Sequence, residues 1–89
     1  MKRFNKPKEI PVRNNRARFE ALGKEGRIHL EGSGEISMSV SLNGQDYTPV
    51  DHEVQFVEGI AIAPFKFIPG DLVQIEAETL TKVQINYSE

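Results

Sequence analysis

Residues 35–42 constrain the fold of this chain more than any other stretch, because apolar and polar residues alternate along them without a break. The apolar members are Ile36, Met38, Val40 and Leu42, with glutamate or serine at the positions between. Successive side chains of a β-strand point to opposite faces, so a period of two is typical of a strand with one buried face. The sequence therefore predicts a strand here whose apolar face belongs to the core.

The dipeptide Asn43-Gly44 follows this strand directly. A type I′ turn requires positive φ at both central residues, which asparagine tolerates and glycine adopts freely. We therefore expect a β-hairpin in which residues 45–50 form the return strand, with Pro49 at a sheet edge or at the end of that strand.

Glycine and proline divide the rest of the chain into segments of strand length. Alternation in 17–22 and in 27–31, with a glycine-bounded turn between them, predicts a second hairpin. Gly32-Ser33-Gly34 and Pro69-Gly70-Asp71 have the composition of tight turns. Further strands are expected at 54–57, 60–68, 72–79 and 82–87.

The segment 60–68 changes the phase of its alternation around Ala63-Pro64, so a bulge or kink is expected at Pro64. No part of the sequence has the pattern of a helix. Two apolar sheet faces must cover each other. The sequence therefore predicts an all-β fold, an antiparallel β-sandwich or barrel of seven to eight short strands with an extended N-terminal arm.

The N-terminal residues 1–16 have no useful period, and two prolines favour extended backbone there. We interpret 1–16 as an extended basic arm and 17–89 as a single β-sandwich domain. Apolar anchors and arginines on such an arm are suited to binding the surface of a partner protein, by burial and by bidentate pairing with carboxylates. The candidate partner-binding residues are Phe4, Ile10, Val12, Arg3, Arg13 and Arg16.

Charge is distributed unevenly along the chain. Residues 1–27 carry nine lysines and arginines against three acidic residues, a net charge of +6, whereas the remainder carries two against ten, a net charge of −8. A basic lead and an acidic body are complementary between copies of the chain, or the lead binds another acidic surface. A homo-oligomer is therefore one expected arrangement.

We expect no enzymatic activity, because neither His29 nor His52 stands beside a nucleophile motif. Asp51-His52-Glu53 contains possible metal ligands, but adjacent residues seldom converge on one ion, so neither a metal nor a cofactor is expected. The chain has no cysteine and no apolar run near the roughly 20 residues that span a bilayer. No export signal and no contact with a membrane are expected.

Two other kinds of binding module remain as alternatives. A carbohydrate-binding module commonly presents aromatic platforms, for which this chain offers Tyr47 and Tyr87 but no tryptophan. A nucleic-acid-binding module would use the basic arm on phosphates, although the acidic body opposes it.

The segments Ser41-Leu-Asn-Gly-Gln-Asp-Tyr-Thr-Pro-Val50 and Ile68-Pro-Gly-Asp-Leu-Val73, followed by a strand-rich C-terminal part, give residues 33–87 a resemblance to small β-sandwich virion proteins of tailed phages. The resemblance implies a capsid decoration, auxiliary or fibre-base protein. Such a protein binds the major capsid protein and stabilises the shell through its arm and a sheet face. It would be located in the virion, assembled in the host cytoplasm.

Overall fold

The computed structural model describes residues 8–21, 26–65 and 68–87. These residues form seven strands and no helix, and every strand pairing among them is antiparallel, which confirms the all-β expectation. This part of the chain accordingly contains no helix that could cross a membrane. The strands are β1 (Lys8–Ile10), β2 (Val12–Arg13), β3 (Arg16–Glu20), β4 (Gly26–Ser41), β5 (Thr48–Pro49), β6 (Ile60–Phe65) and β7 (Leu72–Tyr87).

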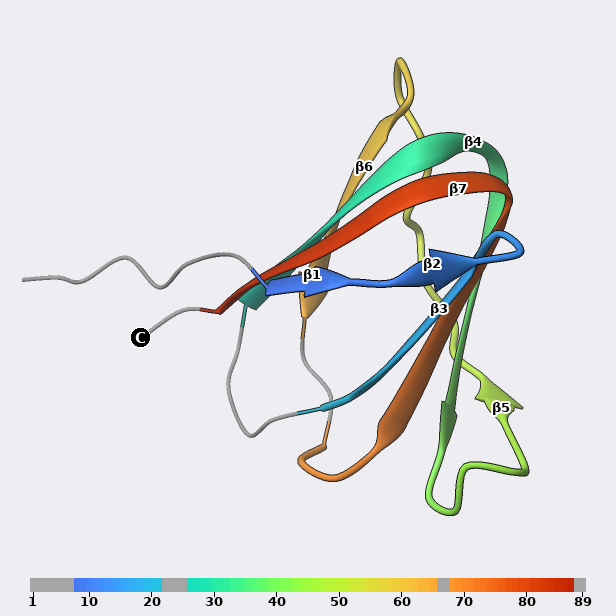
Figure 1. Ribbon diagram of the computed structural model, residues 1–89, viewed down its shortest axis with the longest axis vertical. Helices are drawn as coiled ribbons and strands as arrows, with labels where there is room; N and C mark the ends of the chain where they lie inside the picture. Colours follow the sequence, from blue (N-terminus) through green and yellow to red (C-terminus); the bar gives the residue numbers. More distant parts are fainter. Residues whose placement is uncertain (1–7, 22–25, 66–67, 88–89) are drawn as a thin grey trace, which may run out of the picture.

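The two long strands β4 and β7 organise the molecule. Each has 16 residues, and they pair from Gly26 opposite Tyr87 to Ser41 opposite Leu72. They arch together, so that a single sheet folds back on itself (Figure 1). The first half of β4 and the second half of β7 lie between β6 and β1, in what we call the β1/β6 layer. Their other halves lie between β5 and β3, with β2 outside β3, in the β3/β5 layer. The predicted sandwich is therefore built from one bent sheet.

The bend lies at residues 32–34 of β4, where the sequence predicted a turn. The strand continues through these residues, but its register against β7 shifts on both sides of Gly32 and Ser33. A Cβ atom on Gly32 would overlap the carbonyl oxygen of Thr79, and Gly34 has a φ of 89°. Only glycine allows the two strands to approach so closely and to bend there. The expected turn is thus a bulged corner between the layers.

The core between the layers is built mainly from the inward faces of the long strands, with further side chains from β1, β3 and β6. Its largest fully buried side chains come from the first half of β4 and from both halves of β7, and they follow the alternation of the sequence. They are Ile28, Leu30, Val73, Ile75, Val83 and Ile85.

The predicted hairpin of 17–22 and 27–31 is wrong. β3 pairs with the first half of β7, where Ala17 lies opposite Ile75, whereas the start of β4 pairs with β6 and with the end of β7. The two segments therefore belong to different layers. Each segment pairs instead with β7, which is remote in sequence and is long enough to pair with one segment in each layer.

The hairpin at residues 43–44 exists, but its type I′ turn does not. β5 pairs with β4 through Val40 opposite Thr48, which leaves a wide loop, and Asn43 has no positive φ. Ser41, which is 3% exposed, accepts hydrogen bonds from the N–H groups of Asn43 and Gly44 at 3.2 and 2.9 Å. Beyond the end of β4, a side-chain oxygen thus accepts hydrogen bonds from backbone N–H groups in place of a paired strand. Leu42, expected in the core, is 89% exposed because β4 ends before it.

Turns with positive φ at both central residues occur elsewhere. Asn14-Asn15 (52° and 61°) joins β2 to β3, and Glu58-Gly59 (53° and 82°) joins Val57 to Ile60. The turn before Asp71 is confirmed, since the N–H of Asp71 donates to the carbonyl of Ile68 at 3.1 Å.

The expected bulge at Pro64 is wrong. Pro64 lies opposite Arg27 in an unbroken register between β6 and β4. Among the described residues β4 is the one named strand that pairs with β6, and Val57 adds a bridge at Ile60 on the other edge. That outer edge requires no N–H donor from Pro64, which is oriented away from β4.

Candidate protein-binding surface

The pairing of β6 with β4 decides which β6 side chains face outward. Ala61 lies opposite Leu30, and Ala63 lies opposite Ile28. Residues directly opposite each other in an antiparallel pair share one face of the sheet. Leu30 and Ile28 are fully buried, so the two alanines face the core with them and are 3% and 2% exposed.

The isoleucines of β6 consequently face solvent. Ile60 is 45% exposed and Ile62 is 59% exposed. Val57, which is 70% exposed, lies opposite Ile60 and exchanges two backbone hydrogen bonds with it, at 2.8 and 3.1 Å. The three side chains share one face, and we call them the β6 apolar patch. Large apolar side chains gathered on an outer face are typical of interaction surfaces.

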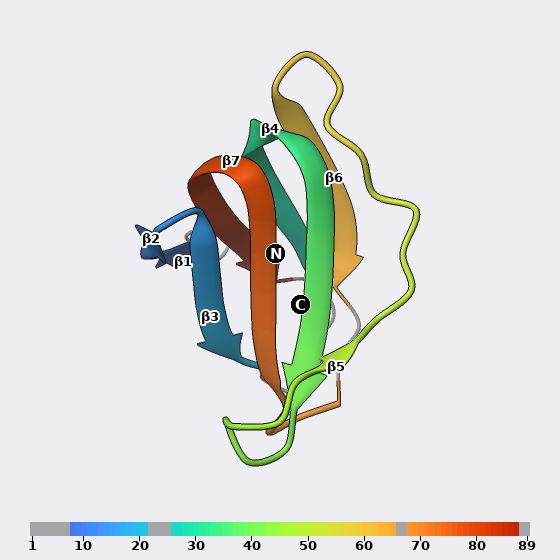
Figure 2. The same ribbon diagram turned by 90° about the vertical axis from the view of Figure 1, so that its right-hand side faces the viewer.

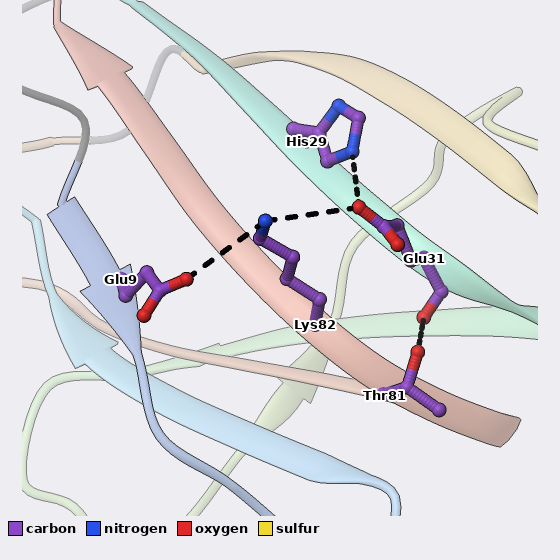
Figure 3. A network of polar contacts seen from close by, with 5 residues as sticks. All are labelled: Glu9, His29, Glu31, Thr81 and Lys82. Carbon is purple, nitrogen blue, oxygen red and sulfur yellow. Dashed lines mark hydrogen bonds and ion pairs between the residues drawn. The ribbon is translucent and has the colours of Figure 1, made fainter.

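A polar network borders this patch. Glu31 of β4 lies opposite Ile60, and its carboxylate is 3.0 Å from Nε2 of His29 and 3.9 Å from Nζ of Lys82. Lys82 in turn lies 3.9 Å from the carboxylate of Glu9 (Figure 3). The network therefore runs from β4 across β7 to β1. An apolar centre with a charged border has the anatomy of a protein–protein interface.

The backbone of β6 offers little to an added strand. The N–H and C=O of Ile60 already pair with Val57, and alternation orients Ile62 and Pro64 to the same outer edge. Pro64 has no N–H to donate. A partner at β6 would therefore gain mainly from side-chain burial.

The predicted arm residues are placed differently from one another. Phe4 and Arg3 lie outside the described residues. Ile10 lies on β1 opposite Val83 and is 6% exposed within the core, and Val12 is half-buried against that core. Residues 8–16 are thus part of the sheet, and Ile10 stabilises the fold from within.

Arg13 and Arg16 are exposed and lie opposite each other across β2 and β3. With Arg18 they line a shallow groove of about 380 Å³, whose other lining residues are Pro11 and Asn14. Arg16 is 3.2 Å from the carboxylate of Glu76. We call the three arginines the arginine edge. The structure therefore brings two of the predicted partner-binding residues together with Arg18, which the sequence also offers for pairing with carboxylates of a partner.

Arg18 makes two contacts on this edge. Its Nε donates to the side-chain oxygen of Gln74 at 2.8 Å, and its guanidinium carbon lies 5.2 Å from the centre of the Tyr47 ring. Such stacking is a cation–π contact. The ring of Tyr47 is therefore partly covered, which weakens it as a carbohydrate platform, and the side chain of Tyr87 lies outside the description.

His52 has a structural role. Its Nε2 donates to the carbonyl of Ile36 at 2.8 Å, and its Nδ1 accepts from the N–H of Val54 at 3.1 Å. Asp51 and Glu53 are exposed. Within the described ranges no three potential ligands are grouped in a way that could hold a metal ion.

No protein-family model matches the chain, and no curated protein or solved structure matches it significantly. The surfaces described above are therefore the basis for inferring function. Sequence reasoning missed the β6 apolar patch because the isoleucines look like core residues. The signal for the correct phase was the alanine at each alternate position, which fits the buried side of a strand opposite larger residues.

Proposed function

We propose that this protein is a non-enzymatic structural subunit of a larger protein assembly and that it binds this assembly through the β6 apolar patch. The observation that supports the proposal is the shared outward exposure of Val57, Ile60 and Ile62. Covering a large apolar side chain contributes roughly 1.5–3 kcal/mol, whereas an exposed ion pair contributes about 0–1 kcal/mol. The patch would thus supply affinity, and the adjoining polar network would supply orientation.

We further propose that the assembly is the capsid of a tailed phage, with the major capsid protein as the partner and the virion as the location. This part of the proposal rests on the resemblance of residues 33–87 to phage decoration and auxiliary proteins, which is an argument by analogy. A decoration protein requires binding surfaces and no catalytic centre, which agrees with the surface described above.

A nucleic-acid-binding module is the alternative function. The observation in its favour is the arginine edge, where three guanidinium groups line one groove. Phosphate binding would make affinity fall steeply as salt rises, because counterions are released on binding. Binding through the β6 apolar patch would survive moderate salt.

Sedimentation of particles from the cells that produce this protein tests the proposal. We expect the protein in the particle fraction at many copies per particle, with density for a small sandwich on the shell by electron microscopy. The double variant Ile60→Ser, Ile62→Ser should be released from the particles, because its apolar contact is lost. Arg13→Gln with Arg16→Gln is the matched control and should remain bound.

Two results would contradict the proposal. One is a protein found only in the slow, particle-free fraction. The other is release by the arginine variant alone together with a steep salt dependence, which would favour the nucleic-acid alternative. Since the isoleucines are exposed, their replacement should leave the domain folded, so release would report on binding.

A further inference from the structure

Two opposite edges of the molecule carry opposite charge. At the first, the arginine edge, Arg13 and Arg16 lie directly opposite each other, an arrangement that like charges disfavour. Glu76 compensates one of the three arginines, which leaves a net charge of +2 among these four residues. Arg13 has no hydrogen-bond or ion-pair partner among the residues that the structure describes. An external anionic group would relieve this repulsion.

The second edge is acidic. The sequence contains no lysine or arginine from residue 28 to residue 65, but six acidic residues. Three of these, Asp51, Glu53 and Glu58, are exposed on the segment between β5 and β6, and none has an ion-pair partner in the described ranges. We call these three residues the acidic loop.

The acidic loop is held in a defined position. The N–H of Val50 donates to the carbonyl of Met38 at 2.9 Å, and His52 donates to the carbonyl of Ile36 at 2.8 Å. Val54 and Phe56 are partly buried against the core. The carboxylates are therefore presented from a fixed segment, which lowers the entropy cost of binding a complementary surface.

The order of the strands separates the two edges. In the β3/β5 layer the order is β2, β3, β7, β4, β5, so the arginines and the segment that follows β5 lie at opposite ends. Figure 2 shows β2 and β3 on one side of the molecule and the long segment between β5 and β6 on the other. The arginine edge of one copy therefore cannot contact the acidic loop of the same copy, but it can contact the acidic loop of a second copy.

We propose that copies of this chain associate head to tail, with the arginine edge of one copy on the acidic loop of the next. The charge complementarity of the two edges supports this inference. Because the edges are separate surfaces of the chain, the contact is heterologous, which means that each copy contributes a different surface to it. A heterologous contact repeats, so it forms a ring where the rotation closes and an open chain where it does not. This association goes beyond binding to a shell and does not depend on it, because it uses neither isoleucine of the β6 apolar patch.

Sedimentation velocity of the purified, nuclease-treated protein tests the proposal. At about 0.01 M salt, where charges act over about 30 Å, the average mass should rise with concentration above that of one chain. At about 1 M salt, where charges act over about 3 Å, it should return to one chain. Arg13→Glu with Arg18→Glu, and separately Asp51→Lys with Glu53→Lys, should each abolish the growth at low salt. Arg27→Glu, an exposed charge reversal outside both edges, should preserve it.

Mixing the two charge-reversed variants provides the sharper measurement. The arginine-reversed variant keeps an intact acidic loop, and the acid-reversed variant keeps an intact arginine edge. Their mixture should associate again, with the two variants alternating in equal proportion, because each edge of one variant is then opposite in charge to the edge it meets on the other, although each variant alone stays a single chain. A variant that carries all four reversals should assemble again, because both edges have exchanged sign.

Three outcomes would overturn the proposal. The first is a wild-type protein that stays a single chain at low salt at every concentration. The second is growth that survives either set of reversals, or a mixture of the two variants that does not associate. The third is association that disappears on nuclease treatment, which would assign the arginine edge to nucleic acid. None of these outcomes changes the expected sedimentation of the protein with particles, so the two proposals fail separately.

Discussion

The side-chain oxygen of Asn15 accepts a hydrogen bond from the backbone N–H of Leu80, at 3.1 Å and across 65 positions of the sequence. The backbone carbonyl of Asn15 also accepts from the N–H of Ala77 at 3.3 Å. Both donors lie where β7 bends and where its register with β4 shifts. The turn between β2 and β3 thus supplies acceptors that the interrupted ladder cannot provide, which avoids the cost of unpaired backbone groups.

Replacing Asn15 by glycine should lower the free energy of unfolding by about 1–3 kcal/mol, since the acceptor for the Leu80 amide is lost. Asn14→Gly is the matched control, because Asn14 also has positive φ and both variants share the entropy cost of glycine. Urea denaturation of the two variants measures the difference. Equal midpoints would mean that the hydrogen bond contributes nothing to stability.

A second prediction concerns Gly32, at the corner of the sheet. Gly32→Ala places a Cβ atom against the backbone of Thr79, which cannot rotate away, so we expect a loss of about 3 kcal/mol or a failure to fold. Ser33→Ala, at the exposed neighbouring position, should change stability by less than about 0.5 kcal/mol. Thermal melts followed by circular dichroism check both variants, and a Gly32→Ala protein as stable as wild type would refute the tight approach of β4 to β7.

Ile10 and Ile62 offer the same substitution in two environments. Ile10→Ala should cost about 2–5 kcal/mol, because it opens a cavity in the core beside β7. Ile62→Ala should cost less than about 0.5 kcal/mol, because its side chain faces solvent. Chemical denaturation gives both values. Similar small losses at the two sites would restore the interpretation of residues 8–16 as an arm outside the fold.

His52→Ala should loosen the acidic loop. It removes the donor to Ile36 and the acceptor for Val54, so we expect a stability loss of about 1–3 kcal/mol. Hydrogen exchange of the Val54 amide should accelerate. His29→Ala is the control, since the one polar contact of the His29 ring within the described ranges is with the partly exposed carboxylate of Glu31. Unchanged exchange at Val54 would show that the loop is held by its apolar contacts alone.

The strand pattern could be predicted from the sequence, because it depends on local periodicity. A single polar residue separates Val73 from Ile75 and Val83 from Ile85, and this alternation places all four apolar residues in the core without knowledge of any partner strand. The turn at Pro69-Gly70 could be predicted for the same reason, since its chemistry is contained in the dipeptide.

The candidate surfaces could be predicted only in part. The arginines of the edge were recognisable in the sequence as a basic cluster. Their groove, however, depends on the turn at Asn14-Asn15, and although asparagine tolerates positive φ, this dipeptide does not by itself predict a hairpin. The β6 apolar patch was hidden, since the phase of a strand such as Ile60-Ala-Ile-Ala63 is ambiguous until its neighbour is known.

By itself the sequence determined the antiparallel all-β class, the inward face of most long-strand residues and the separation of charge along the chain. Only the tertiary structure decided which strands pair, that β4 and β7 run unbroken through a glycine corner, that Ile10 lies inside, and that Ile60 and Ile62 lie outside. The physical reason is that alternation is local, whereas pairing is a choice among distant strands. That choice depends on which pairing buries the largest apolar faces and leaves the fewest backbone N–H and C=O groups unpaired over the whole sheet.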